Sequence, residues 1–107
     1  FRVNENPSTE LNEIGLISLP TTLLLSQNYP NPFNPTTQIA YQLPDAANVR
    51  LSVFNLLGQE VEVLVNERKE AGSYTAFWNA SYLSSGVYMY RLEVGSNVIT
   101  KRMTLIK

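Results

Sequence analysis

Apolar and polar residues alternate along most of the chain, in short runs separated by turn-forming residues. In the stretch 37–43, for example, Ile39, Tyr41 and Leu43 share one parity, and polar or small residues occupy the other. Successive side chains of a strand point to opposite faces, so alternation with a period of two predicts a half-buried β-strand. No stretch of useful length shows helical periodicity, which favours an all-β chain.

The same alternation recurs later in the chain and predicts further strands. The apolar positions are Val49, Leu51 and Val53, then Val61, Val63 and Val65, then Tyr74, Ala76 and Trp78, then alternate residues of 87–94 and 98–106, with a short run at 23–25 before them all. The charged stretch 66–71 is predicted to be a solvated hairpin loop. About seven short strands, with turns roughly every 8–12 residues, predict an immunoglobulin-like antiparallel β-sandwich.

Prolines crowd the stretch 28–35, which reads Asn28-Tyr29-Pro30-Asn31-Pro32-Phe33-Asn34-Pro35. Proline has no backbone N–H and disfavours a helical residue before it, so this stretch can form neither a helix nor a central strand. It is predicted to be a stiff, extended loop. Its rings, Tyr29 and Phe33, are expected to be buried clamps that pin the loop; the alternative is that they are exposed recognition knobs.

Three other positions carry structural information. Tyr88 closes an L-x-x-G-x-Y pattern that begins at Leu83, and is expected to be a tyrosine corner whose hydroxyl bonds to backbone upstream. Gly86 of the same pattern opens the sixth strand. Gly58 breaks the run before it and is the expected positive-φ residue of a turn. Trp78 is expected to fill the core, and a sugar-stacking role is the alternative.

The 107 residues suit one domain with a short extension. Residues 1–20 are acidic and poor in aliphatic side chains, so they are predicted to be a linker from a preceding passenger domain, with a loosely docked first strand as the alternative. The domain itself is predicted to span 21–107.

The amino-acid composition limits the catalytic and metal-binding chemistry that the chain can perform. The chain has no cysteine and no histidine, which excludes thiolate metal sites and Ser-His or Cys-His nucleophiles. Glu60 and Glu62 are expected to share one solvated strand face rather than to form a catalytic pair. The net charge of −1 with scattered basic residues favours no nucleic-acid partner. The expected protein is not an enzyme and has no cofactor, no metal and no small-molecule substrate.

Several of these segments together resemble one family. The proline box 25–37, the stretch 53–61 with its L-G-x-E pattern, the stretch 83–91 and the basic-apolar finish 101–107 resemble, in order, the boxes of type A C-terminal sorting domains of the type IX (Por) secretion system. The resemblance offers these sorting-motif candidates: Asn28, Tyr29, Pro30, Asn31, Pro32, Phe33, Gly58, Gly86, Tyr88, Lys101, Arg102 and Lys107.

The resemblance implies a non-catalytic address label for an N-terminal passenger. The folded domain would be recognised in the periplasm by the outer-membrane translocon of the type IX system. A sortase-like peptidase would then cut within 1–22, and the passenger would be joined to a surface glycolipid or released. The implied location is therefore the periplasm in transit, and then the cell surface or the extracellular space.

The sequence is also compatible with two other functions. Similar boxes occur in the immunoglobulin-like domain of the flagellar hook-capping protein, which would make the chain a structural or assembly module. The finish at Lys107 favours the sorting domain over that interpretation. A carbohydrate-binding module appended to a secreted enzyme is the other alternative, and it predicts two or more coplanar exposed aromatic rings.

Overall fold

The computed structural model describes residues 22–107, so the linker predicted for 1–20 lies outside the described residues. These residues form seven strands and no helix, and hence no helix that could cross a membrane. The strands are β1 (Leu24–Leu25), β2 (Thr36–Leu43), β3 (Ala47–Phe54), β4 (Glu60–Lys69), β5 (Gly72–Asn79), β6 (Gly86–Val94) and β7 (Asn97–Leu105).

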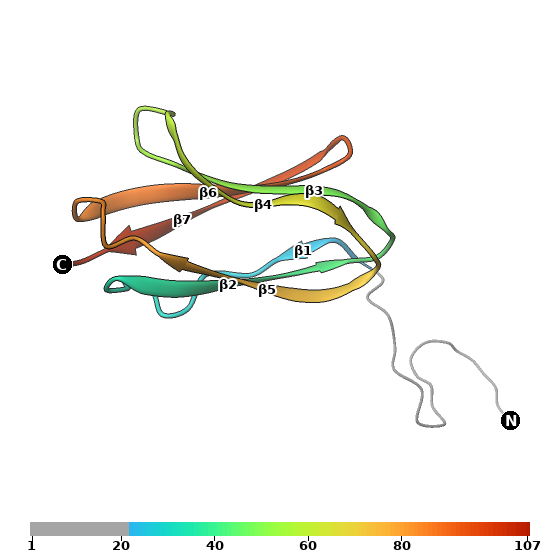
Figure 1. Cartoon of the computed structure of the whole chain (residues 1–107), viewed down its shortest axis with the longest axis horizontal. Coiled ribbons are helices and arrows are strands. Elements are labelled where there is room, and N and C mark those ends of the chain that lie inside the picture. The colour runs from blue at the N-terminus through green and yellow to red at the C-terminus, as the bar shows by residue number, and fades with distance from the viewer. Residues whose placement is uncertain (1–21) are drawn as a thin grey trace, which may run out of the picture.

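The strands make two antiparallel sheets that face each other (Figure 1). One sheet has the order β1-β2-β5 and the other the order β4-β3-β6-β7. The predicted all-β sandwich of about seven strands is confirmed. Strands β2 and β6 bury one parity, as the alternation predicted: Ile39 and Tyr41 from β2 join Leu51 from β3 and Leu92 from β6 in one core. The alternation predicted for β4 is wrong, because two register shifts place Val65 opposite Leu51 but Val63 opposite Ser52, and no residue of β4 is fully buried.

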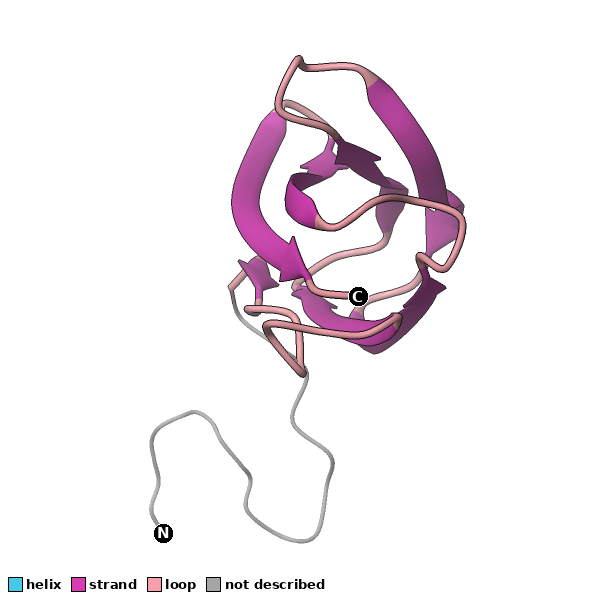
Figure 2. Cartoon of the chain, turned by 90° about the vertical axis from the view of Figure 1, so that its left-hand side faces the viewer, coloured by secondary structure: helices cyan, strands magenta, loops and turns pink. Residues whose placement is uncertain are grey.

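Antiparallel pairing sorts the connections to two ends of the sandwich (Figure 1). One end carries 44–46, 70–71 and 95–96, together with Thr22, where the described chain begins. The other, which we call the distal end, carries 55–59, 80–85 and 106–107, and it faces the viewer in Figure 2.

The predicted loop at 66–71 is wrong, because β4 continues to Lys69 and only Glu70 and Ala71 connect it to β5. The pairing of β3 with β4 runs on to Ala47 opposite Lys69. Since β4 is an edge strand, its charged side chains can stay in water while its backbone remains in the ladder.

The expectation that Glu60 and Glu62 share a face is also wrong. The register places Glu60 opposite Phe54 but Glu62 opposite Val53, so Val61 is an extra residue in a β-bulge. The bulge turns the two carboxylates to opposite faces. Glu60 pairs with Arg50 at 2.7 Å on the outer face, and Glu62 accepts a hydrogen bond from the Tyr82 hydroxyl.

Candidate recognition surface

The proline segment, residues 28–35, crosses from one sheet to the other. At its start Tyr29 exchanges two backbone hydrogen bonds of 2.9 Å with Gln38 of β2. Four residues later Phe33 lies beside Leu105 of β7 as a parallel bridge: its N–H donates to Thr104 and its carbonyl accepts from Ile106, both at 2.9 Å. Proline has no N–H to donate. Pro30 and Pro32 lie between Tyr29 and Phe33, whose N–H groups make these bonds to β2 and β7.

The two aromatic rings of this segment differ in exposure, because one is buried and the other lies in solvent. Phe33 is 2% exposed, and its ring centroid lies 5.9 Å from that of Trp78, so the clamp expectation is confirmed for Phe33. Tyr29 is 72% exposed, so the clamp expectation is wrong for Tyr29. Its bridge with Gln38 places it on the outer face of the β1-β2-β5 sheet, away from the core. Trp78 is buried, as expected of a core residue.

A buried polar node holds the start of the segment. The Asn28 N–H donates to the Tyr90 hydroxyl at 2.9 Å, and that hydroxyl donates to the Ser26 carbonyl at 2.8 Å. The Asn28 side-chain amide donates to the Thr37 hydroxyl and to the Pro30 carbonyl, at 3.0 and 3.1 Å. Every member of the node therefore has a partner, which a buried polar group requires.

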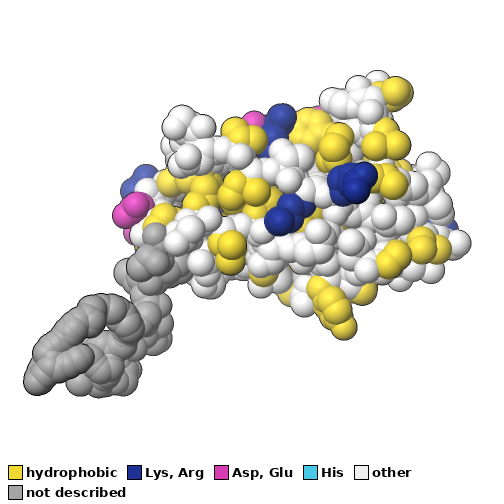
Figure 3. All heavy atoms as spheres, turned by 180° about the vertical axis from the view of Figure 1, so that it is seen from behind, with side chains coloured by type: hydrophobic (Ala, Val, Ile, Leu, Met, Phe, Trp, Pro, Cys, Tyr) yellow, Lys and Arg dark blue, Asp and Glu magenta, His cyan; other side chains and the backbone are white. Residues whose placement is uncertain are grey.

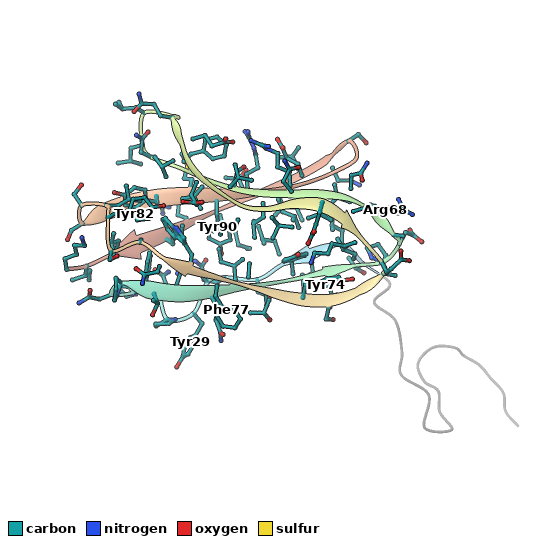
Figure 4. The ribbon with its side chains drawn as sticks, viewed as in Figure 1. Tyr29, Arg68, Tyr74, Phe77, Tyr82 and Tyr90 are labelled. Carbon is teal, nitrogen blue, oxygen red and sulfur yellow. The ribbon has the colours of Figure 1, made fainter. Side chains whose placement is uncertain are left out.

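Tyr90 was missed as a functional residue by the sequence reasoning. It is fully buried between the two sheets (Figure 4), its hydroxyl bonds to Ser26 and Asn28 in the segment between β1 and β2, and burial raises its pKa to about 12. Its sequence signal is a tyrosine at a core-parity position, because a phenol hydroxyl in a core needs a partner. Thr37 was missed as well. Its hydroxyl is buried too and therefore also needs a hydrogen-bond partner.

The proline segment also covers part of the free edge of β7. The Asn31 side-chain oxygen accepts from the Thr104 N–H at 3.0 Å, and the Gln27 amide donates to the Arg102 carbonyl at 2.6 Å. The same edge continues to Thr100 and Val98, where no further strand of the described chain is paired. Half of this edge is therefore covered, and half is open for pairing.

The sorting-motif candidates Lys101 and Arg102 on β7 point to opposite sides of the strand. Lys101 lies opposite the buried Tyr90, on the inner face at the edge of the sandwich, whereas Arg102 lies opposite Met89 on the outer face. Adjacent residues of a strand point to opposite sides, so only Arg102 projects from the outer face.

Lys107 hydrogen-bonds to the stretch 81–88. The Tyr88 hydroxyl donates to the Ser84 carbonyl at 2.7 Å, so the predicted tyrosine corner is confirmed. The Lys107 N–H donates to the Ser85 hydroxyl at 2.9 Å, and its ammonium donates to the Ser81 carbonyl at 2.6 Å. Gly86, which opens β6 as expected, lies opposite Leu105 and so belongs to the same neighbourhood.

Gly58 lies in the β3–β4 turn at the distal end with a φ of +83°, which confirms the expected positive φ. The Asn55 side-chain oxygen accepts from the N–H groups of Leu57 and Gln59 and makes the turn rigid. Leu57 is 84% exposed at its tip.

We define the recognition face as the proline segment, the outward edge of β7 and Lys107. Figure 3 views the molecule from this side, where Lys and Arg side chains stand among hydrophobic ones and acidic side chains are few. Within residues 22–107 no three acidic, cysteine or histidine side chains gather as metal ligands would. The recognition face combines a rigid proline segment, the positive charge of Arg102 and the unpaired edge of β7. Such features can bind another protein.

Comparison with known proteins adds one match. A family model described as a secretion system C-terminal sorting domain matches residues 27–107. The match begins just before the proline segment and ends at Lys107, so it contains the whole recognition face. A comparison with curated proteins found no match.

Proposed function

The chain belongs to the family of secretion system C-terminal sorting domains, and we propose that its recognition face is the surface that the type IX translocon reads. The family is one of sorting signals rather than of enzymes. Membership implies an N-terminal passenger, secretion machinery as partner, and secretion to the cell surface or the extracellular space.

The pairing of Phe33 with Leu105 is the observation that carries this proposal. It joins the first and the last of the family-like boxes, which lie about seventy positions apart in the sequence, into one surface. Such a surface exists only in the folded domain. A receptor that reads it would therefore export only chains whose sorting domain has folded.

The open half of the β7 edge suggests how the receptor binds. Its backbone groups near Thr100 can pair with an added strand, and this mode of recognition depends little on the passenger. Arg102 on the outer face would then contact an acidic surface of the partner, which would also speed association.

The later steps follow from the same proposal. The domain is recognised in the periplasm, crosses the outer membrane with its passenger, and is then removed by a sortase-like peptidase that cuts within residues 1–22. The passenger is released or attached to the cell surface. The distal end, which carries Lys107, lies away from Thr22, so a receptor bound there would leave the cleavage region accessible.

A secretion assay tests the proposal. A fluorescent reporter directed to the periplasm is joined to residues 1–107 in a host with a type IX system, beside the same fusion lacking 101–107. We expect reporter outside the cell for the intact fusion alone. The truncation removes part of β7, so the intact fusion in a mutant host without the translocon serves as the matched control. Equal export of the intact fusion from both hosts would contradict the proposal.

A further inference from the structure

Two exposed aromatic rings stand on the outer face of the β1-β2-β5 sheet. Tyr29 lies opposite Gln38, and Gln38 lies opposite Phe77, so the three side chains form one row across neighbouring strands. Tyr29 is 72% and Phe77 is 74% exposed. Figure 4 shows both rings on the side of this sheet that faces away from the other sheet.

A hollow of about 590 Å³ lies between the two rings. Their strands are two spacings apart, about 10 Å in all, which leaves room for a ring-shaped ligand between them. Gln38, Thr36 and Asn79 also line the hollow. The Asn79 side-chain oxygen accepts from the Ser81 N–H, and among the described residues no hydrogen bond holds the Gln38 amide.

The chemistry of the hollow selects a class of ligand. The lining residues carry no charge, so a phosphate or carboxylate ligand would find no cation to pair with. Aromatic walls with a few hydroxyl and amide groups suit a ligand that has both apolar faces and hydroxyls. A pyranose ring has C–H faces that stack on aromatic rings, and hydroxyls that both donate to and accept from amides.

We propose that the Tyr29–Phe77 hollow binds a neutral glycan. The rings hold sugar faces, and Gln38 and Asn79 hydrogen-bond the sugar hydroxyls. This site goes beyond the proposed sorting function, and Phe77 lies outside the recognition face. The two proposals therefore fail separately: loss of glycan binding in Phe77→Ala leaves export unchanged.

Affinity electrophoresis of the whole chain tests the site. Native gels hold galactomannan, xyloglucan or dextran as neutral probes, or alginate as an anionic one. We expect retardation by at least one neutral polysaccharide and none by alginate. Phe77→Ala and Tyr29→Ala should each weaken binding about tenfold, the scale of a lost aromatic contact. Leu57→Ala removes an equally exposed apolar side chain elsewhere and should bind as the unsubstituted chain does.

Circular dichroism checks that both aromatic variants fold, and exposed positions such as these tolerate alanine. Absence of retardation in all three neutral gels would overturn the proposal. Retardation that both aromatic substitutions leave unchanged would overturn it as well, because the glycan would then bind elsewhere.

Discussion

Phe33 and Leu105 lie side by side as a parallel bridge, with the Phe33 backbone bonded to Thr104 and to Ile106 at 2.9 Å. The ring of Phe33 packs into the core against Trp78. This contact closes one side of the sandwich, because the segment that begins paired to β2 ends paired to β7. The last strand and the proline segment are therefore parts of one structural unit.

Phe33→Ala should lower the free energy of unfolding by about 3–5 kcal/mol, since it removes a fully buried ring and leaves a cavity beside Trp78. Urea unfolding monitored by tryptophan fluorescence measures the loss. Tyr29→Ala is the matched control: its ring is exposed, and the cost should stay within about 1 kcal/mol. Equal losses for the two variants would contradict the assignment of Phe33 as the anchor.

Tyr90→Phe should destabilise the domain by about 1–3 kcal/mol, because the buried N–H of Asn28 loses its acceptor. The ring itself remains, so no cavity forms. Urea unfolding at neutral pH gives the value. Tyr74→Phe, which deletes a hydroxyl bonded to the Glu70 carbonyl in an exposed setting, should cost less. A neutral outcome for Tyr90→Phe would mean that the node adds nothing to stability.

Tyr90 also predicts a dependence on pH. Burial raises its pKa from 10.0 to about 12 in the folded domain. The unfolded chain therefore releases this proton first, and the stability that is fully present below pH 10.0 falls as the pH rises toward about 12. Urea midpoints measured across this range should fall less steeply for Tyr90→Phe. Burial raises the pKa of Tyr41 and Tyr82 too, so some slope should remain.

Gly58→Ala should cost about 1–2 kcal/mol, because a φ of +83° is unfavourable for a residue with a Cβ. Space is not the cause, since no atom lies within 4 Å of the position that a Cβ would take. Gly58→Asn should cost less, because asparagine tolerates this conformation better. Thermal unfolding compares the two, and equal midpoints would indicate that the turn relaxes to another shape.

The strands were predictable from the sequence because burial in a sandwich follows parity. Ile39, Leu51 and Leu92 are buried where the alternation placed them. The turn at Gly58 and the tyrosine corner at Tyr88 were predictable as well, because each depends on neighbours close in the sequence.

What could not be predicted depends on register and on distant partners. One extra residue in β4 separated Glu60 from Glu62, and no local pattern signals such a bulge. Tyr29 and Phe33 look alike in sequence, yet one pairs with β2 and the other with β7, which decides their exposure. The bond between Asn28 and Tyr90 spans 62 positions, so only the fold brings these two residues together.

Export of the reporter fused to the whole chain carrying Arg102→Glu, beside Arg68→Glu, tests whether the translocon reads the recognition face. Both arginines are exposed, and they lie on opposite edge strands of one sheet, β7 and β4. Circular dichroism should show both variants folded, since surface substitutions cost within about 0.5 kcal/mol. We predict that Arg102→Glu lowers export about tenfold, which corresponds to about 1.4 kcal/mol of binding, while Arg68→Glu is exported normally. Normal export of both folded variants, or an equal loss in both, would contradict the claim that the translocon reads the recognition face.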